Sequence, residues 1–205
     1  MNTAMDEQHP VTLIVGDDLR RSRVTVFFRY LLTIPHFVWL WLWTIAVYVV
    51  ALVNWFLTLA MGRPPRLFHR FIAAFLRYQL HVTAYLVLAA NPFPGFTGAP
   101  GSYPLDLVLP AEPQRQNRVK TLFRAVLIIP GWAIAAVLAY GMYICGFFTW
   151  WVALFTGKAP SGLRDLQAYA LRYQAQLNAY LFLITDRYPS ASPFVGTEMG
   201  STAAA

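Results

Sequence analysis

The sequence predicts an all-α integral membrane protein, built by tandem duplication of a helical unit in which each copy is preceded by a short β-strand. The first observation is composition: 58% of the 205 residues are hydrophobic and 12% are charged, whereas a soluble domain is about 25% charged. The second is a pair of 33-residue stretches, 30–62 and 125–157, that contain no Lys, Arg, Asp or Glu. Roughly 20 apolar residues cross a bilayer, so each stretch is long enough.

The third observation is an internal repeat at an offset of 95 residues. "RYQ" occurs at residues 77–79 and again at 172–174, and residues 22–94 align with the second copy without a gap, with 22 of 73 positions identical. Further upstream, "HPVTLIV" resembles "YPLDLVL". Self-similarity at a fixed period indicates one structural unit used twice.

The first repeat, residues 1–94, divides into four elements. Pro35 disfavours α geometry in the residue before it, which predicts a break between a lead-in helix and a membrane helix. Gly62 closes the membrane helix and prolines follow it, as is typical of a helix C-terminus. The predicted elements are a strand arm at 9–15, a lead-in helix at 23–34, a membrane helix at 36–61 and a polar-striped helix at 67–90.

The second repeat, residues 103–189, follows a Pro/Gly linker at 95–102. Its membrane helix carries Gly131, Ala135 and Ala139 at four-residue spacing, which either lets another helix approach closely or is merely tolerated in an apolar helix. Residues 190–205 are predicted to be a disordered tail. The predicted elements are a strand arm at 103–109, a lead-in helix at 118–129, a membrane helix at 131–156 and a polar-striped helix at 163–184.

The polar-striped helices carry ionisable or polar side chains along one side, namely Arg70, Arg77 and His81 in the first copy and Asp165, Arg172 and Gln176 in the second. These side chains leave two topologies open. In the first, all four long helices cross the bilayer and the arginine stripes face inward. In the second, each apolar stretch dips into the membrane and returns as a hairpin, and the polar-striped helix lies on the membrane surface. Four spans put nine Lys and Arg on the N-terminal side and seven on the other, whereas the hairpins put all sixteen on one side, which fits the positive-inside rule better. Because neither apolar stretch has a mid-membrane breaker common to both copies, four spans are favoured. The copies then run parallel, in a multi-pass protein of the cell membrane with both termini in the cytoplasm.

Each copy carries the same motif: a leading strand, R-x5-R-x4-IP, a long apolar segment, G-[RK]-x-P and LRYQ…AYL…YP. The matching residues are Arg23, Arg29, Ile34-Pro35 and Gly62-Arg63-Pro64-Pro65 in the first copy, and Arg118, Arg124, Ile129-Pro130 and Gly157-Lys158-Ala159-Pro160 in the second. This pattern, which covers nearly the whole chain, resembles a bacterial membrane family known as domain of unknown function 4389. The resemblance implies tandem helical membrane modules, and it implies no activity.

The repeated "RYQ" supplies the candidate binding residues, Arg77, Gln79, Arg172 and Gln174. An arginine within a membrane costs free energy, and it therefore marks a functional site or a structural contact. One interpretation is a site for an anionic lipid headgroup or another anion, because the guanidinium fork bonds two phosphate oxygens at once. The other is architectural: the two arginines tie helices together or reach to headgroups, and repetition at equivalent positions favours this interpretation.

The sequence predicts no catalytic residue, metal site or cofactor. No nucleophile elbow, phosphate-binding glycine loop or Cys/His metal spacing is present. The net charge is +7, and the basic residues that cause it flank the apolar stretches. This placement indicates that they interact with anionic lipid headgroups rather than with nucleic acid. We therefore expect a non-enzymatic membrane scaffold or accessory subunit, with a membrane protein partner or a homo-oligomer. The alternative is an anionic-lipid- or anion-binding transporter or channel with Arg77 and Arg172 at the repeat interface.

Overall fold

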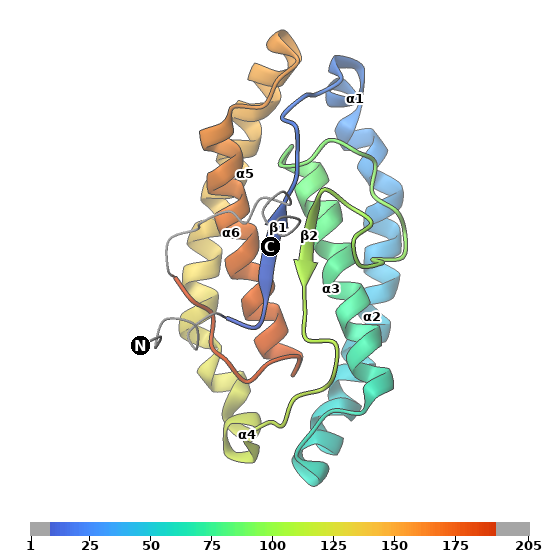
Figure 1. Ribbon diagram of the computed structural model, residues 1–205, viewed down its shortest axis with the longest axis vertical. Helices are drawn as coiled ribbons and strands as arrows, with labels where there is room; N and C mark the ends of the chain where they lie inside the picture. The colour runs from blue at the N-terminus through green and yellow to red at the C-terminus, as the bar shows by residue number, and fades with distance from the viewer. Residues whose placement is uncertain (1–8, 192–205) are drawn as a thin grey trace, which may run out of the picture.

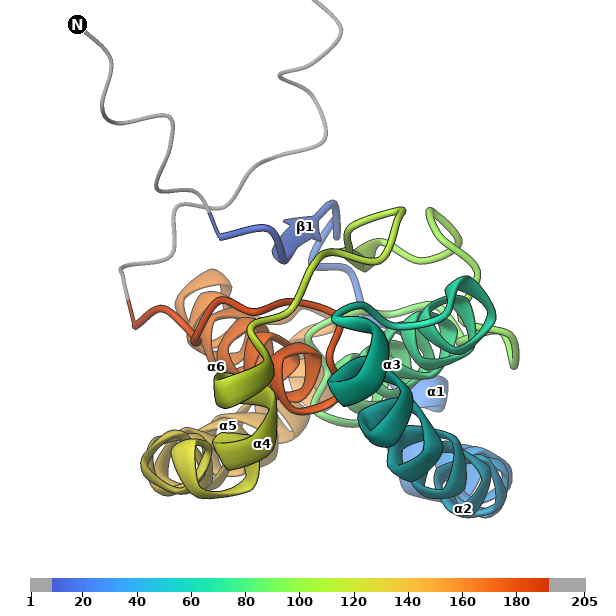
Figure 2. The same cartoon turned by 90° about the horizontal axis from the view of Figure 1, so that it is seen from below.

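The computed structural model describes residues 9–191, and these form three layers (Figures 1 and 2). A two-stranded sheet forms the first layer, two inner helices the second, and two long outer helices the third. The predicted tail lies mostly outside the described residues. In chain order the elements are β1 (Thr12–Val15), α1 (Arg23–Phe27), α2 (Arg29–Met61), α3 (Arg66–Leu86), β2 (Leu105–Val108), α4 (Arg118–Leu127), α5 (Ile129–Thr156) and α6 (Ser161–Leu181).

The prediction that Pro35 breaks the first apolar stretch is wrong. Helix α2 runs through Pro35, and the interruption lies at Phe28, between α1 and α2. The restriction that proline places on its neighbour is a preference, and buried contacts on both sides override it: Arg29 and His36 are each fully buried. In the second copy the prediction holds within two residues, because α4 ends at Leu127 and Pro130 lies in the first turn of α5, where its missing N–H costs nothing.

The helix ends follow local chemistry that differs between outer and inner helices. Gly62 and Gly157 cap α2 and α5 in the left-handed conformation, at φ 76° and 71°, as the sequence predicts. The inner helices α3 and α6 end earlier than the predicted boundaries at residues 90 and 184. Each is followed by a leucine at φ 64°, Leu88 and Leu183. A left-handed leucine costs free energy, and both side chains are almost completely buried, which offsets that cost.

The two predicted strand arms pair in one antiparallel sheet. Both observed strands are shorter than the predicted arms, and the register joins Leu13 to Leu107 and Val15 to Leu105. These four side chains face the inner helices and are buried. The apolar alternation of each arm therefore predicts the buried face of the sheet correctly.

The two copies run antiparallel, so the prediction of parallel copies is wrong. The N–H of Arg21 donates to the carbonyl of Gly157 at 2.8 Å, and the equivalent N–H of Gln116 donates to the carbonyl of Gly62 at 2.9 Å. The indole of Trp150 donates to the Val26 carbonyl, which lies at one end of the molecule. The start of each copy thus contacts the far end of the other copy's long helix. A pseudo-twofold axis normal to the layers relates the copies (Figure 1).

Each copy also lends its N-terminal elements to the other. Strand β1 packs on α6 and β2 on α3, while α1 packs on α5 and α4 on α2. The Nε2 of Gln176 in α6 donates to the Val11 carbonyl at 3.0 Å, and its counterpart His81 in α3 bonds Asp106 of β2 at 2.8 Å. The structural unit is therefore the intertwined pair and not the single repeat.

Close packing of α5 on α6 bears out one use of the small residues. A Cβ added to Gly131 would lie 2.6 Å from Cδ1 of Leu177 and 2.7 Å from the hydroxyl of Tyr188. Ala135 is also buried. Ala135 and Ala139 both line a hollow on the α5 side, so the contact too close for an added Cβ is at Gly131.

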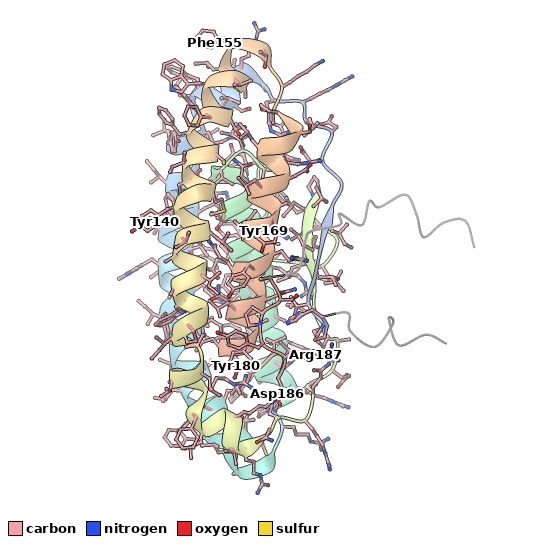
Figure 3. The ribbon with its side chains drawn as sticks, turned by 90° about the vertical axis from the view of Figure 1, so that its left-hand side faces the viewer. Tyr140, Phe155, Tyr169, Tyr180, Asp186 and Arg187 are labelled. Carbon is pink, nitrogen blue, oxygen red and sulfur yellow. The ribbon has the colours of Figure 1, made fainter. Side chains whose placement is uncertain are left out.

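The outer helix α2 has its polarity reversed relative to a helix on the surface of a soluble protein. Its buried residues are Arg29, Thr33, His36, Val47, Asn54 and Thr58, of which five are polar. Its exposed side chains are apolar, including Trp41 at 65% and Leu52 at 61% exposure. Figure 3 shows Tyr140 and Phe155 projecting from α5 on the side away from the strands. The layer of outer helices therefore presents an apolar surface on the side opposite the sheet.

Candidate functional site

A small hollow lies where α3 and α6 cross, on the pseudo-twofold axis. Each wall residue from α3 has its 95-residue counterpart from α6, so the site is built twice from the same helix positions. The amide of Asn178 donates to Oε1 of Gln79 at 3.5 Å across the axis. The lining residues are Leu76, Gln79, Leu80 and Thr83 from α3, and Leu171, Gln174, Ala175 and Asn178 from α6.

Two further spaces share lining residues with this hollow. On the α2 side, a space of about 120 Å³ is lined by Tyr48 of α2 and Trp132 of α5 together. On the α5 side a space of about 340 Å³ reaches Tyr143. Asn178 borders all three spaces. The arrangement is an apolar, aromatic groove with an uncharged amide floor, suited to hydrogen bonding with a neutral polar group attached to an apolar body.

The four candidate residues do not form one site. Gln79 and Gln174 line the hollow on the axis. Arg77 lies on the sheet side, where its Nε donates to the Leu107 carbonyl of β2 at 3.1 Å. Arg172 places its guanidinium 5.4 Å from the ring centre of Tyr169. The glutamines and arginines of each "RYQ" point to different faces of their helix because residues two positions apart lie about 200° apart around it.

A pair of arginines from the R-x5-R motif, rather than those of "RYQ", holds the helix ends together. Arg29 Nη1 donates to the carbonyls of Tyr85 at 2.7 Å and Ala90 at 3.0 Å, and its guanidinium lies 4.2 Å above the Tyr85 ring. Arg124 repeats these contacts on the equivalent residues of the second copy: the carbonyls of Tyr180 and Thr185 and the Tyr180 ring. Both guanidinium groups cap the end of an inner helix from a buried position.

The two copies differ in the side chain that faces this arginine, which is anionic in the second copy only. Arg124 Nη2 donates to Asp186 at 2.8 Å and to Gln116 at 2.9 Å. In the first copy Asn91 takes the place of the aspartate and accepts from Arg29 at 3.3 Å. The sequence contains this exchange, because "NPFP" at 91–94 in the first copy aligns with "DRYP" at 186–189 in the second. A charged residue kept at equivalent positions beside apolar neighbours is the signal that identifies Arg29 and Arg124.

On the opposite side of the inner layer, His81 and Asp106 join α3 to β2. Asp106 accepts from His81 at 2.8 Å and from its neighbour's N–H, that of Leu107, at 2.8 Å. Burial alone would raise the pKa of the Asp106 carboxyl, but the hydrogen bonds from His81, Gly101 and Leu107 outweigh burial and place its pKa below its usual range. The arrangement anchors a strand.

No group of three or more His, Cys, Asp or Glu side chains that could hold a metal ion occurs within residues 9–191. The lining of the hollow on the pseudo-twofold axis contains no ionisable side chain. It offers amides and a hydroxyl, which are donors and acceptors for hydrogen bonds. The chemistry that the hollow supports is recognition of a neutral polar group.

The fold and the hollow define a duplicated, intertwined helical protein in which α2 and α5 are long and apolar enough to cross a membrane. The chain belongs to the family described as domain of unknown function (DUF4389), whose model matches residues 23–97 and 118–193. Two tandem copies are thus present, as the sequence motifs indicate. Among curated proteins and among solved structures, nothing matches the chain.

Proposed function

We propose that this protein is a membrane-embedded, non-catalytic scaffold or accessory subunit. The observation that carries the proposal is the exposure of the outer helices. Only 17% of the most apolar 18-residue window of α2, and 28% of that of α5, is buried. A core helix of a soluble protein is mostly buried, and soluble monomers rarely expose large contiguous apolar patches. Lipid is the environment in which such a surface is stable.

The polar residues support a structural role. His36 bonds the hydroxyl of Tyr78 at 2.7 Å between α2 and α3, and Gln167 donates to the Val87 carbonyl at 2.8 Å between α6 and the end of the first copy. Arg29 and Arg124 act in the same way. These groups hold helices together from the inside, which leaves the sheet side as the surface for a protein partner.

Membrane extraction and purification test the two parts of this proposal separately. The protein should remain in the membrane fraction after alkaline carbonate washing, and it should co-purify with a stoichiometric partner in mild detergent. Release by carbonate would remove the membrane proposal. A solitary, stable monomer under several mild detergents would remove the scaffold proposal while leaving membrane embedding intact.

The second candidate function is lipid or anion binding, and the axial hollow favours a form of it. The original expectation places an anion between Arg77 and Arg172, whereas the hollow presents Gln79, Gln174 and Asn178 to the groove. Native mass spectrometry of the purified protein distinguishes the two. Retained anionic lipid that is lost in Arg77→Ala/Arg172→Ala supports the arginine site; retained neutral lipid that is lost in Gln79→Leu/Gln174→Leu supports the hollow. No retained lipid removes this function.

A further inference from the structure

We infer that the molecule lies in one leaflet with its long helices parallel to the membrane surface, so that the pseudo-twofold axis coincides with the membrane normal. The layer of α2 and α5 then faces the acyl chains, and the sheet faces water. This inference rests on the proposed membrane embedding and departs from the four-span arrangement that the sequence favours.

The length of the apolar surface is the first argument. Helix α2 has 33 residues, which is roughly 50 Å at 1.5 Å per residue, against about 30 Å of hydrocarbon. Exposed apolar side chains occur along all of it, from Leu31 at 61% to Met61 at 53%, and they continue into α1 with Val24 at 68%. To fit this surface into the hydrocarbon, the helix would have to tilt by more than about 50°, beyond the usual range of roughly 0–40°.

The second copy repeats this surface over α4 and α5. Exposed apolar side chains begin at Val119, 66% exposed, and continue to Phe155, 69% exposed. These positions lie near opposite ends of the molecule, because α4 is at one end and the C-terminus of α5 at the other (Figure 1). A surface lying along the leaflet has no such length limit, so the whole of it contacts lipid.

The position of the sheet is the second argument. Strands β1 and β2 lie against the middle of α6 and α3, not at their ends (Figure 1). Spanning helices would therefore hold a two-stranded sheet with open edges, together with the Asp106–His81 pair, at mid-bilayer depth. Open sheet edges exposed to lipid leave backbone groups without partners, each at a cost of several kcal/mol. The in-plane orientation places the same groups in water, where they are hydrated.

The distribution of charge is the third argument. Because the copies are antiparallel, equivalent basic residues such as Arg63 and Lys158 lie at opposite ends of the helices. A spanning molecule would then place Arg63 and Lys158, which the count for four parallel spans puts on one side, on opposite sides of the membrane. The in-plane orientation places every Lys and Arg on one side, in accordance with the positive-inside rule.

Cysteine accessibility tests the orientation with a symmetry-related pair. In a Cys145→Ala background, Arg63→Cys and Lys158→Cys introduce single thiols at two exposed, equivalent turns. A membrane-impermeant maleimide is added to right-side-out or to inside-out vesicles. We expect both thiols to react in the same vesicle orientation and neither to react in the other. Reaction of the two thiols in opposite orientations would overturn the inference. A spanning oligomer, in which a partner covers the sheet, would give this same result.

Two further positions separate failure of the orientation from failure of membrane embedding. Val108 on β2 is 44% exposed. The thiol of Val108→Cys should react from the same side as the thiols at residues 63 and 158. Val137 on α5 is 71% exposed on the apolar face, and Val137→Cys should react only after detergent denaturation. If Val137→Cys reacts freely in intact vesicles, the proposed membrane embedding fails. If it is shielded while residues 63 and 158 react from opposite sides, the in-plane orientation alone fails.

Discussion

Replacing Arg124 by methionine should destabilise the protein severely. Its side chain is 2% exposed, and its guanidinium donates to two backbone carbonyls, to Gln116 and to Asp186. Methionine preserves most of the side-chain volume and removes every donor. Breaking a buried ion pair by removing one partner costs about 3–5 kcal/mol. Asp186 is partly exposed and recovers some hydration, so most of this cost comes from the carbonyls of Tyr180 and Thr185.

The assay is thermal unfolding in detergent, followed by the fluorescence of the seven tryptophans. For a chain of this size a loss of 1 kcal/mol lowers Tm by about 2–4 °C, so Arg124→Met should lower Tm by roughly 6–20 °C. Arg29→Met should have a comparable effect, because the first copy repeats the same carbonyl contacts. Arg124→Lys should not restore stability, since an ammonium cannot reproduce the planar fork.

Arg77→Met is the matched control. Arg77 is half-buried, and its Nε makes one hydrogen bond to β2, so its loss should cost about 1 kcal/mol. Asp186→Asn is a second control, since it gives the second copy the polar partner that the first copy already has in Asn91. The assignment of the helix-end role to Arg124 is refuted if Arg124→Met unfolds within the error of Arg77→Met.

Three further predictions follow from the packing. Gly131→Val should cost about 1–3 kcal/mol by overpacking against Leu177, whereas Gly141→Ala, which meets nothing within 4 Å, should stabilise by about 0.5–1 kcal/mol; equal melting temperatures would contradict the close approach. Because the folded pKa of Asp106 lies below its unfolded value of about 3.9, its stabilising contribution is complete above that value and is lost as pH falls through the folded pKa. Melting curves between pH 6 and 3 should therefore show a smaller acid loss for Asp106→Asn than for the unaltered chain, and an identical loss would count against the anchor. Fragments 1–97 and 103–193 should be unstable as monomers and should assemble when co-expressed, since each strand packs on the other copy's helix; a folded monomer of either fragment on gel filtration would contradict the intertwining.

The sequence could predict those parts of the candidate site that depend on position along one helix. Gln79 and Gln174 each lie two positions after an arginine, and residues two positions apart on a helix lie about 200° apart around it, so they point to different faces. The participation of Asn178 could not be predicted, because it depends on how α6 crosses α3. The repeated charge in an apolar context marks Arg29, but its partners could not be predicted, since they are carbonyls exposed only where α3 ends at Leu86.

The sequence by itself determined the duplication, the two long apolar helices, the glycine caps at Gly62 and Gly157 and the two strand arms. Each of these depends on local composition, local backbone preference or alternation along one segment. Only the tertiary structure decided that the copies are antiparallel and exchange their N-terminal elements. The physical reason is the length of the connection: about 30 residues separate α3 from α4 and can extend to about 100 Å, so the chain reaches either end of a helix of about 50 Å. The choice is made by contacts between residues far apart in the chain, such as Arg21 with Gly157 and Gln116 with Gly62.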